Sequence, residues 1–390
     1  MRMQDVKFLL ALSLGLASLA HSLEFKPVAD SKLGGGYSEE QGQAGSWNAS
    51  GHLTLLPLLG LNKNNIVAPL LFIDLADRER VIEEDATFLQ RLIVVGKPVW
   101  KHKFENGSEG SLYGSAKRVV NQEKLADPWS ENIYDYEEYG AGLGWSKKLW
   151  IFEEASFDLA YSGRTYDNFH NRTPSGAKNY YTKDMNITKL SLGLSLPPSE
   201  RGKLSLDYFL DLRNYTDAYI IQGDGSIDQG RLRGDQFHYL NIQATKAEGH
   251  WGHSLGLQAI WNLSNQNSFD YVANVPYENF YSYASYALRP EISWLPQGKP
   301  SGHRVSLGYQ ALLRNYGGRS IQNPDGTKTQ GTQADVEHNF NLNGFYAYNS
   351  WLGFYLDLTY DVVRSNQAYE NVLKYSYDLF NSTASVGLRY

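Results

Sequence analysis

Apolar and polar side chains alternate along stretch after stretch of this chain, and the alternation limits the fold more than any other feature. In GKLSLDYFLDLRNY, residues 202–215, leucine or tyrosine occupies every second position from 204 to 212, and mostly charged or small residues lie between them. Residues 189–196, 283–294 and 352–361 repeat the pattern. Successive side chains of a β-strand point to opposite faces, so each stretch predicts a strand with one apolar and one polar face.

Two all-β folds fit this alternation. In a soluble sandwich the apolar faces form a core, whereas in a transmembrane barrel they meet lipid and the polar faces line the interior. A helical membrane protein is excluded, because beyond residue 22 the longest apolar runs, LLPLLGL and IVAPLLFI, are far shorter than the roughly 18 residues a spanning helix needs. The net charge of −6 argues against a nucleic-acid surface, and the absence of cysteine excludes disulfides.

The first 22 residues, MRMQDVKFLLALSLGLASLAHS, predict a secretory signal peptide. The basic residues Arg2 and Lys7 come before the apolar stretch of residues 8–20, and small residues lie at its end, at Ala20 and Ser22. The apolar stretch is too short to span a membrane as a helix. We therefore expect a signal peptide over residues 1–22 and one β-barrel domain over residues 23–390.

The connections between the alternating stretches differ in length in a regular way. Short polar connections recur about every 50 residues, the first near residues 146–148. Longer polar segments lie between them and are predicted as loops at residues 168–184, 217–234, 266–277, 317–333 and 366–372. Short turns at one end and long loops at the other are typical of outer-membrane barrels.

Tryptophan gathers beside the short connections. Indole rings favour the boundary between membrane and water, so this placement predicts an aromatic girdle. The predicted girdle consists of Trp145, Trp150, Trp251, Trp294, Trp351 and the terminal Tyr390.

Strand counting back from residue 390 predicts an antiparallel transmembrane barrel of about 16 strands, an even number as expected for a bacterial barrel. Counts of 12 or 14 stay open, because LADRERVIEEDATFLQRLIVVGKPVW, residues 75–100, could instead form a short helix or a plug in the interior.

The last residues, NSTASVGLRY, form an amphipathic strand that ends on an aromatic residue. This resembles the sorting and assembly signal of bacterial outer-membrane barrel proteins. The resemblance implies the outer membrane of a Gram-negative bacterium, with membrane lipid and the outer-membrane assembly machinery as partners.

Four short motifs recur 101 residues apart, among them RNY at 213–215 and 314–316 and SNQ at 264–266 and 365–367. The common offset predicts duplication of a four-strand unit. Because Asn, Asp and Gly favour turns, we expect these residues to organise loops. RNY and SNQ also resemble the barrels of surface-lipoprotein assembly modulators, which implies a possible export role. Those proteins carry an N-terminal helical repeat domain, for which this chain shows no pattern.

The polar faces carry many charges that a barrel would turn inward. Rings of mixed charge can tune which solutes pass, or opposite charges can pair and fill the space. Arg213 and Arg314 occupy the same repeat position and are the leading selectivity candidates. The inward candidates are Asp158, Asp207, Asp211, Arg213, Arg289, Glu291, Arg304, Arg314, Asp357 and Asp361.

Catalytic motifs are absent from the sequence, and the one candidate is His170, near Asp167 in a predicted loop. No motif predicts a metal or cofactor. We therefore expect a porin-like channel for passive diffusion of small polar solutes, not an enzyme. An export or assembly barrel that works with a partner protein stays open, as does a barrel-embedded hydrolase, and a homo-oligomer is possible. No nucleic-acid partner is expected.

Overall fold

The computed structural model describes residues 24–40, 45–81, 86–122, 129, 132–149, 151–169, 183–199, 202–270, 275–296, 302–369 and 375–389. All the secondary-structure elements found in these ranges are β-strands. Within the same ranges, no helix is long and apolar enough to cross a membrane. The predicted signal peptide lies outside the described residues, as do Trp150, His170 and Tyr390.

Twenty strands follow one another along the chain. They are β1 (Glu24–Lys26), β2 (Ala29–Glu40), β3 (Ser46–Leu55), β4 (Leu58–Asn62), β5 (Asn65–Val81), β6 (Ala86–Lys103), β7 (Glu109–Gln122), β8 (Tyr136–Leu149), β9 (Phe152–Thr165), β10 (Met185–Ser195), β11 (Lys203–Ile221), β12 (Ile227–Glu248), β13 (Trp251–Ser264), β14 (Ser268–Asp270), β15 (Val275–Tyr277), β16 (Tyr283–Trp294), β17 (Arg304–Gln322), β18 (Lys328–Ala347), β19 (Leu352–Ser365) and β20 (Tyr377–Arg389).

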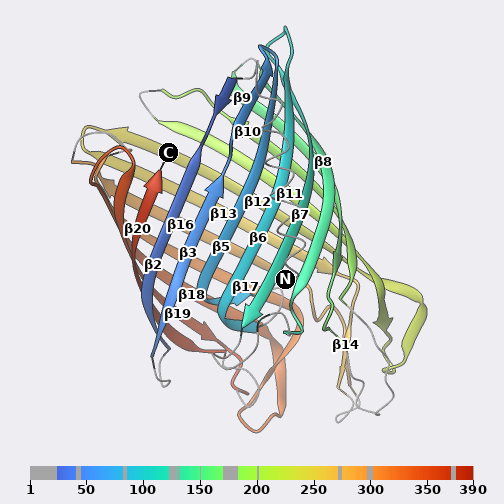
Figure 1. Ribbon diagram of the computed structural model, residues 1–390. Coiled ribbons are helices and arrows are strands. Elements are labelled where there is room, and N and C mark those ends of the chain that lie inside the picture. Colours follow the sequence, from blue (N-terminus) through green and yellow to red (C-terminus); the bar gives the residue numbers. More distant parts are fainter. Residues whose placement is uncertain are drawn as a thin grey trace.

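The strands close into one antiparallel barrel of 16 transmembrane strands, as predicted. Each strand pairs with its neighbour in the chain, and the last strand, β20, pairs with β2 from Asp30 opposite Arg389 to Glu40 opposite Leu379. Figure 1 shows this closure, with the red β20 beside the blue β2 and the strands running obliquely around the wall. The short strands β14 and β15 form a separate ribbon.

Two of the barrel strands are each built from two pieces in line. The first consists of β1 and β2, and the second of β3 and β4, which pair with successive parts of β5. The breaks fall at Pro27 and Pro57. Proline has no backbone N–H to donate to a ladder, so the strand is interrupted where it occurs.

Residues 75–100 belong to the barrel wall in their described part, because β5 and β6 pair along most of their length. The alternative of a helix or plug in this segment is therefore wrong for the described residues. The apolar run LIVVG within β6 continues the wall without a break.

Two predicted loops, 217–234 and 317–333, are wrong, because they are largely extensions of paired strands. β11 continues to Ile221 and β12 begins at Ile227, and β17 and β18 form a second such hairpin. The register shifts between Asn214 and Tyr219, and between Asn315 and Ser320. Beyond these irregularities apolar and polar residues no longer alternate, so the sequence pattern did not predict the strands there. A register shift of this kind bends a hairpin, and the pairing of its strands resumes after the shift.

The turn predicted near residues 146–148 is also wrong, because β8 continues to Leu149 and Lys147 pairs with Ala155. The other short connections lie at the same end of the barrel as residues 24 and 389, and the long ones lie at the opposite end. We call these the short-connection end and the long-connection end.

Large apolar side chains cover the outer face. Leu257 is 47% exposed, Leu307 57% and Leu356 45%. Strand register places such residues side by side across neighbouring strands, for example Leu257 opposite Leu288 and Tyr286 opposite Leu313. A continuous apolar belt of this kind is the surface that a transmembrane barrel presents to lipid.

The outer face is bordered by aromatic side chains at both ends. At the short-connection end Trp251 lies opposite Trp294, and Trp145 and Trp351 are also exposed there. Toward the long-connection end, the hydroxyls of three outward-facing tyrosines donate to neighbouring carboxylates. These bonds are Tyr37 to Glu39 at 2.9 Å, Tyr139 to Glu137 at 3.0 Å and Tyr360 to Asp378 at 3.2 Å.

Candidate functional site

The inner face of the barrel is identified by side chains that meet across an intervening strand. The hydroxyl of Tyr113 on β7 donates to Asp158 on β9 at 2.6 Å, passing over β8. At this level β8 carries Gly142, where a Cβ would lie 2.5 Å from the Tyr113 hydroxyl oxygen. Glycine therefore permits the contact. Alternate strands approach one another on the concave side of a curved sheet, so these side chains face the interior.

Strand register places all ten predicted charged residues on this inner face, opposite in direction to the apolar belt. They are Asp158, Asp207, Asp211, Arg213, Arg289, Glu291, Arg304, Arg314, Asp357 and Asp361. Their role in selectivity stays a prediction.

Some of these charges contact neighbouring side chains, two of them in ion pairs. Asp357 pairs with Lys32 on β2 at 2.5 Å, and Arg213 pairs with Asp211 at 3.4 Å. Asp361 accepts a hydrogen bond from the Asn339 amide at 2.5 Å. The Asp357 and Asp361 contacts join different strands, whereas Arg213 and Asp211 both lie on β11. Such contacts fit the alternative in which inward charges pair and fill the space.

Other inward charges have no such partner. The Arg304 side chain makes no ion pair and no hydrogen bond with any described residue, and the same holds for the side chains of Arg314 and Asp207. Arg289 reaches only neutral groups, the side-chain oxygen of Asn241 at 3.2 Å and the hydroxyl of Tyr239 at 3.4 Å. Arg304 and Arg289 are at least partly exposed, and exposed charges without a counter-ion in the wall are available to ions or polar solutes.

Arg314 differs from the other uncompensated cations in its burial. It is 5% exposed, and its guanidinium carbon lies 5.7 Å from the centre of the Tyr283 ring. Arg213, at the same repeat position, keeps the Asp211 contact. The two leading candidates therefore have different surroundings.

A buried ion network that the sequence did not reveal lies on β8, β9 and β10. The Glu138 carboxylate accepts from Arg164 at 2.9 Å, from Lys189 at 2.7 Å and from the Ser162 hydroxyl at 2.9 Å. The Glu138 side chain is 7% exposed. The two adjacent glutamates point in opposite directions: Glu137 faces outward with Arg118, whereas Glu138 faces inward.

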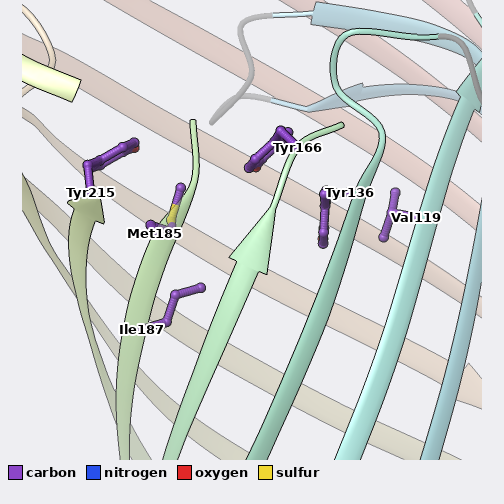
Figure 2. Close-up of a cluster of buried hydrophobic side chains, with 6 residues drawn as sticks. All are labelled: Val119, Tyr136, Tyr166, Met185, Ile187 and Tyr215. Carbon is purple, nitrogen blue, oxygen red and sulfur yellow. The ribbon is translucent and has the colours of Figure 1, made fainter. Parts of the chain in front are cut away.

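Part of the inner face near the long-connection end is dry. A cluster of six side chains from β7 to β11 packs there, consisting of Val119, Tyr136, Tyr166, Met185, Ile187 and Tyr215. Figure 2 shows them side by side on neighbouring strands. Tyr166 and the partly buried Phe169 come from the connection after β9 and cover the wall. Alternation predicted a polar inner face here, but this covering connection excludes water from it.

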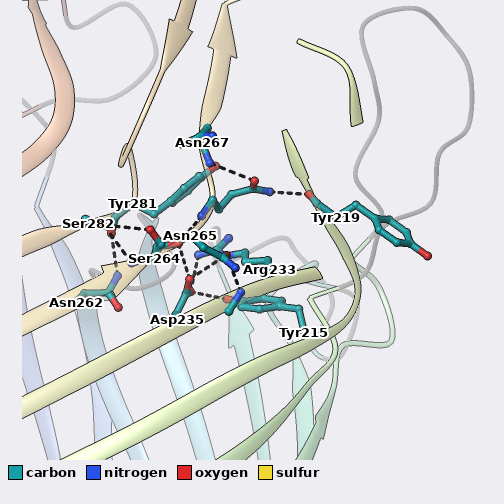
Figure 3. A network of polar contacts seen from close by, with 12 residues as sticks. Tyr215, Tyr219, Arg233, Asp235, Asn262, Ser264, Asn265, Asn267, Tyr281 and Ser282 are labelled. Carbon is teal, nitrogen blue, oxygen red and sulfur yellow. Dashed lines mark hydrogen bonds and ion pairs between the residues drawn. The ribbon is translucent and has the colours of Figure 1, made fainter. Parts of the chain in front are cut away.

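The base of the β11–β12 hairpin holds a second polar network, shown in Figure 3. Asp235 accepts from Arg233 at 2.7 Å, from the Tyr215 hydroxyl at 3.1 Å and from the Ser264 hydroxyl at 2.5 Å. The Arg233 guanidinium also lies over the rings of Tyr215 and Tyr281, at 4.5 and 4.4 Å. Aromatic faces attract a cation electrostatically, so they add to the carboxylate contact.

The repeated SNQ motif makes the same backbone contacts in both copies. Gln266 accepts from the Ile221 amide at 3.0 Å and donates to the Tyr219 carbonyl at 3.0 Å. Gln367 accepts from the Gln322 amide at 2.6 Å and donates to the Ser320 carbonyl at 3.3 Å. The repeated residues therefore organise the connections, as expected.

The strands from β12 to β18 carry a row of carboxamides on the inner face that the sequence reasoning missed. Asn241, Gln310, Asn339 and Asn341 line one polar hollow together with Arg289. The motif NFNLN, residues 339–343, carries asparagine at every second position, and this alternation is the signal that could have revealed it.

Among the described residues, no three His, Asp or Glu side chains converge on a point that would hold a metal ion. His170 lies outside the described ranges, so its proposed partnership with Asp167 stays a prediction.

No protein-family model and no curated protein matches this sequence. Solved outer-membrane proteins do share the fold. OccAB1 of Acinetobacter baumannii aligns with a TM-score of 0.50 and 8% identity, over 94% of this chain and 96% of that one. An anion-selective porin from Comamonas acidovorans aligns at 0.48 and 9%, over 95% and 100%. A bacterial polysaccharide outer membrane secretin aligns at 0.45 and 11%, over 93% and 98%.

At these identities the likeness shows the fold alone. The closed barrel, its apolar outer belt and its polar interior define a transmembrane β-barrel of the outer-membrane type. The protein is therefore located in the outer membrane of a Gram-negative bacterium.

Proposed function

We propose that the barrel is a porin-like channel through which small polar solutes diffuse passively. The observation that carries the proposal is a set of inward and at least partly exposed charges, Arg289, Glu291 and Arg304, for which the described residues supply no counter-ion. Charges held in a wall without a partner are costly unless water or solutes reach them. A barrel of this strand number is also wide enough to leave an aqueous interior.

The proposed role is passive and non-catalytic. Membrane lipid covers the outer belt, and we propose that the assembly machinery of the outer membrane recognises the terminal strand β20, whose Val386 and Leu388 face outward opposite Phe354 and Leu352. Solutes meet only the inner face.

Reconstitution in a planar bilayer tests the channel. The purified protein is expected to produce discrete conductance steps, and the charge reversal Arg304→Glu is expected to move the ion selectivity toward cations. Arg304 is suited to this test because it faces inward and has no described partner whose contact the change would break.

Lys246→Glu supplies the control, because Lys246 faces outward near the short-connection end and its ammonium pairs with Glu248. It should leave the selectivity unchanged. A folded barrel that carries no current would contradict the proposed function, and a selectivity that ignores Arg304 would contradict the part assigned to the unpaired charges.

A further inference from the structure

A polar hollow of about 380 Å³ lies on the inner face where β12, β13, β16, β17 and β18 adjoin. Its lining is dominated by neutral hydrogen-bonding side chains. They include Tyr239, Asn241, Gln243, Ser254, Gln310, Asn339 and Asn341. Such a concentration of amides and hydroxyls on one part of the wall needs a reason beyond solubility, which charged residues would serve equally well.

The asparagines of β18 form a head-to-tail row. The Asn343 amide donates to Asn341 at 3.0 Å, and the Asn341 amide donates to Asn339 at 3.2 Å. A carboxamide has two N–H donors and two acceptor lone pairs, so each member of the row keeps hydrogen-bonding capacity after these contacts. The Gln310 side chain, on the adjacent strand, has no hydrogen-bond partner among the described residues. The hollow therefore offers donors and acceptors side by side.

Charge in the hollow is balanced. Arg289 and Glu291 lie two residues apart on β16 and both line it. They form no ion pair, since Arg289 contacts Asn241 and Tyr239 and Glu291 accepts from the Ser293 hydroxyl at 3.1 Å. One cation and one anion together favour neither sign of ligand, while each can hydrogen-bond strongly to a hydroxyl group.

Glycine keeps the hollow open at one point of close approach. A Cβ at Gly308 would lie 2.5 Å from the Asn341 side-chain oxygen. Any other residue at 308 would displace the Asn341 amide, so the position of this amide depends on the glycine.

An aromatic surface adjoins the hollow. The Phe209 ring on β11 lies 5.5 Å from the Tyr239 ring at an angle of 63°. Phe209 faces inward, in register with Tyr239, and is 41% exposed. An apolar ring exposed in a polar interior can contact the C–H face of a solute whose hydroxyls meet the amides.

The described part of the opposite wall carries other side chains. On β5 and β6 the inward positions include Phe72 opposite Val95, and Lys97, whose ammonium lies 3.5 Å from the centre of the Tyr113 ring. We propose that the hollow binds a neutral polyhydroxylated solute, a sugar, on its way through the barrel. This inference rests on the proposed channel function and adds the class of solute to it.

Calorimetric titration of the full chain in detergent micelles with maltotriose tests the binding without requiring conductance. Saturable binding is expected. The double substitution Asn241→Leu with Asn341→Leu keeps side-chain size but removes two amides, and it should weaken binding about tenfold or more. Phe209→Leu should weaken it by roughly threefold while preserving an apolar side chain.

Asn381→Leu is the matched control, because Asn381 faces inward on β20 but is not among the residues that line the hollow. It should change the affinity less than about twofold. Each variant is checked for folding by its circular dichroism, and Phe209→Leu keeps the test decisive if the double variant does not fold.

Three results would overturn the inference: no maltotriose binding by the folded wild type, equal weakening by the control, or tighter binding of the charged sugar gluconate. Ion current recorded in parallel separates the two proposals. Current without sugar binding removes this inference and retains the channel, whereas sugar binding without current retains the site and removes the channel.

Discussion

The β11–β12 and β17–β18 hairpins are two copies of one projecting unit, and they differ at the base. In the first copy a buried arginine, Arg233, pairs with Asp235. In the second copy the corresponding carboxylate, Asp335, accepts instead from the neutral Gln333 amide at 3.0 Å. Gln333 is 1% exposed and Asp335 4%. The same place in the fold is held by an ion pair in one copy and by a neutral donor in the other.

Several contacts that the two copies share involve the backbone. Asn265 and Asn366 accept from the amides of Gly234 and Ala334, both at 2.8 Å. Asp224 and Asp325 accept from the amides two residues on, both at 2.9 Å. The duplicated frame therefore keeps the contacts that shape the hairpins, while side chains inside the base are free to diverge.

The largest difference between the copies is expected for Asp→Asn substitutions at the base. Asp235→Asn removes the one carboxylate that pairs with the nearly buried Arg233 guanidinium among the described residues, and it should lower the free energy of unfolding by about 3 kcal/mol. Asp335→Asn leaves an amide facing an amide and should cost about 1 kcal/mol. Urea titration in lipid vesicles measures both. Equal losses would show that the ion pair does not distinguish the copies.

The glutamines of SNQ should behave alike. Gln266→Leu and Gln367→Leu each remove a donor and an acceptor for backbone groups of the preceding hairpin. We expect a loss of about 1–2 kcal/mol for each, with faster amide hydrogen exchange confined to the affected hairpin. Exchange that accelerates in the other copy, or in neither, would contradict the assignment of these residues to hairpin organisation.

Glycine at the tips should show a smaller, graded effect. Gly225 and Gly326 have φ angles of 81° and 83°, which other residues adopt at a cost. Alanine at either position should cost about 1 kcal/mol. Gly225→Ala should cost more, because its Cβ would lie 2.7 Å from the Phe269 ring, against 3.2 Å to Tyr369 for Gly326→Ala. The same urea titration ranks them, and the reverse order would refute this account of the tips.

The smallest effect concerns pH. Hydrogen bonds from Ser226 and Thr327 lower the pKa of Asp224 and Asp325, which lie at the exposed tips. Because the folded pKa is below the unfolded one, this stabilisation is complete above the unfolded value and disappears as the pH falls through the folded value. Amide chemical shifts of Ser226 and Thr327 should titrate together below the usual aspartate range. If Asp224 or Asp325 titrates at the ordinary aspartate pKa, the hydrogen bond to its carboxylate does not stabilise that tip.

Strand number, closure and side-chain direction were predictable because alternation repeats where lipid faces one side of the wall and water the other. On the adjacent strands β13 and β16, for example, Leu257 faces outward and Arg289 faces inward, as the alternation predicts. The projecting hairpins were missed because beyond Asn214 and Asn315 neither face meets lipid, so no period of two is imposed.

The candidate site was predictable only in part. Arg304 and Glu291 stand out as charges in an apolar alternation, whereas amides such as Gln310 and Asn341 are ordinary in loops and were not recognised as wall residues. The dry cluster around Ile187 depends on Tyr166 folding back over the wall, a long-range contact that no local pattern encodes. The partners of Arg233 and Gln333 likewise depend on which strands meet.

Swelling of vesicles that contain the purified protein tests the central claim most directly. Vesicles loaded with an impermeant polymer are placed in isotonic solutions of small polar solutes of increasing size. The channel predicts rapid swelling that slows as solute size increases and that protein-free vesicles do not show. Swelling no faster than in protein-free vesicles, for every solute and with the barrel folded, would contradict it.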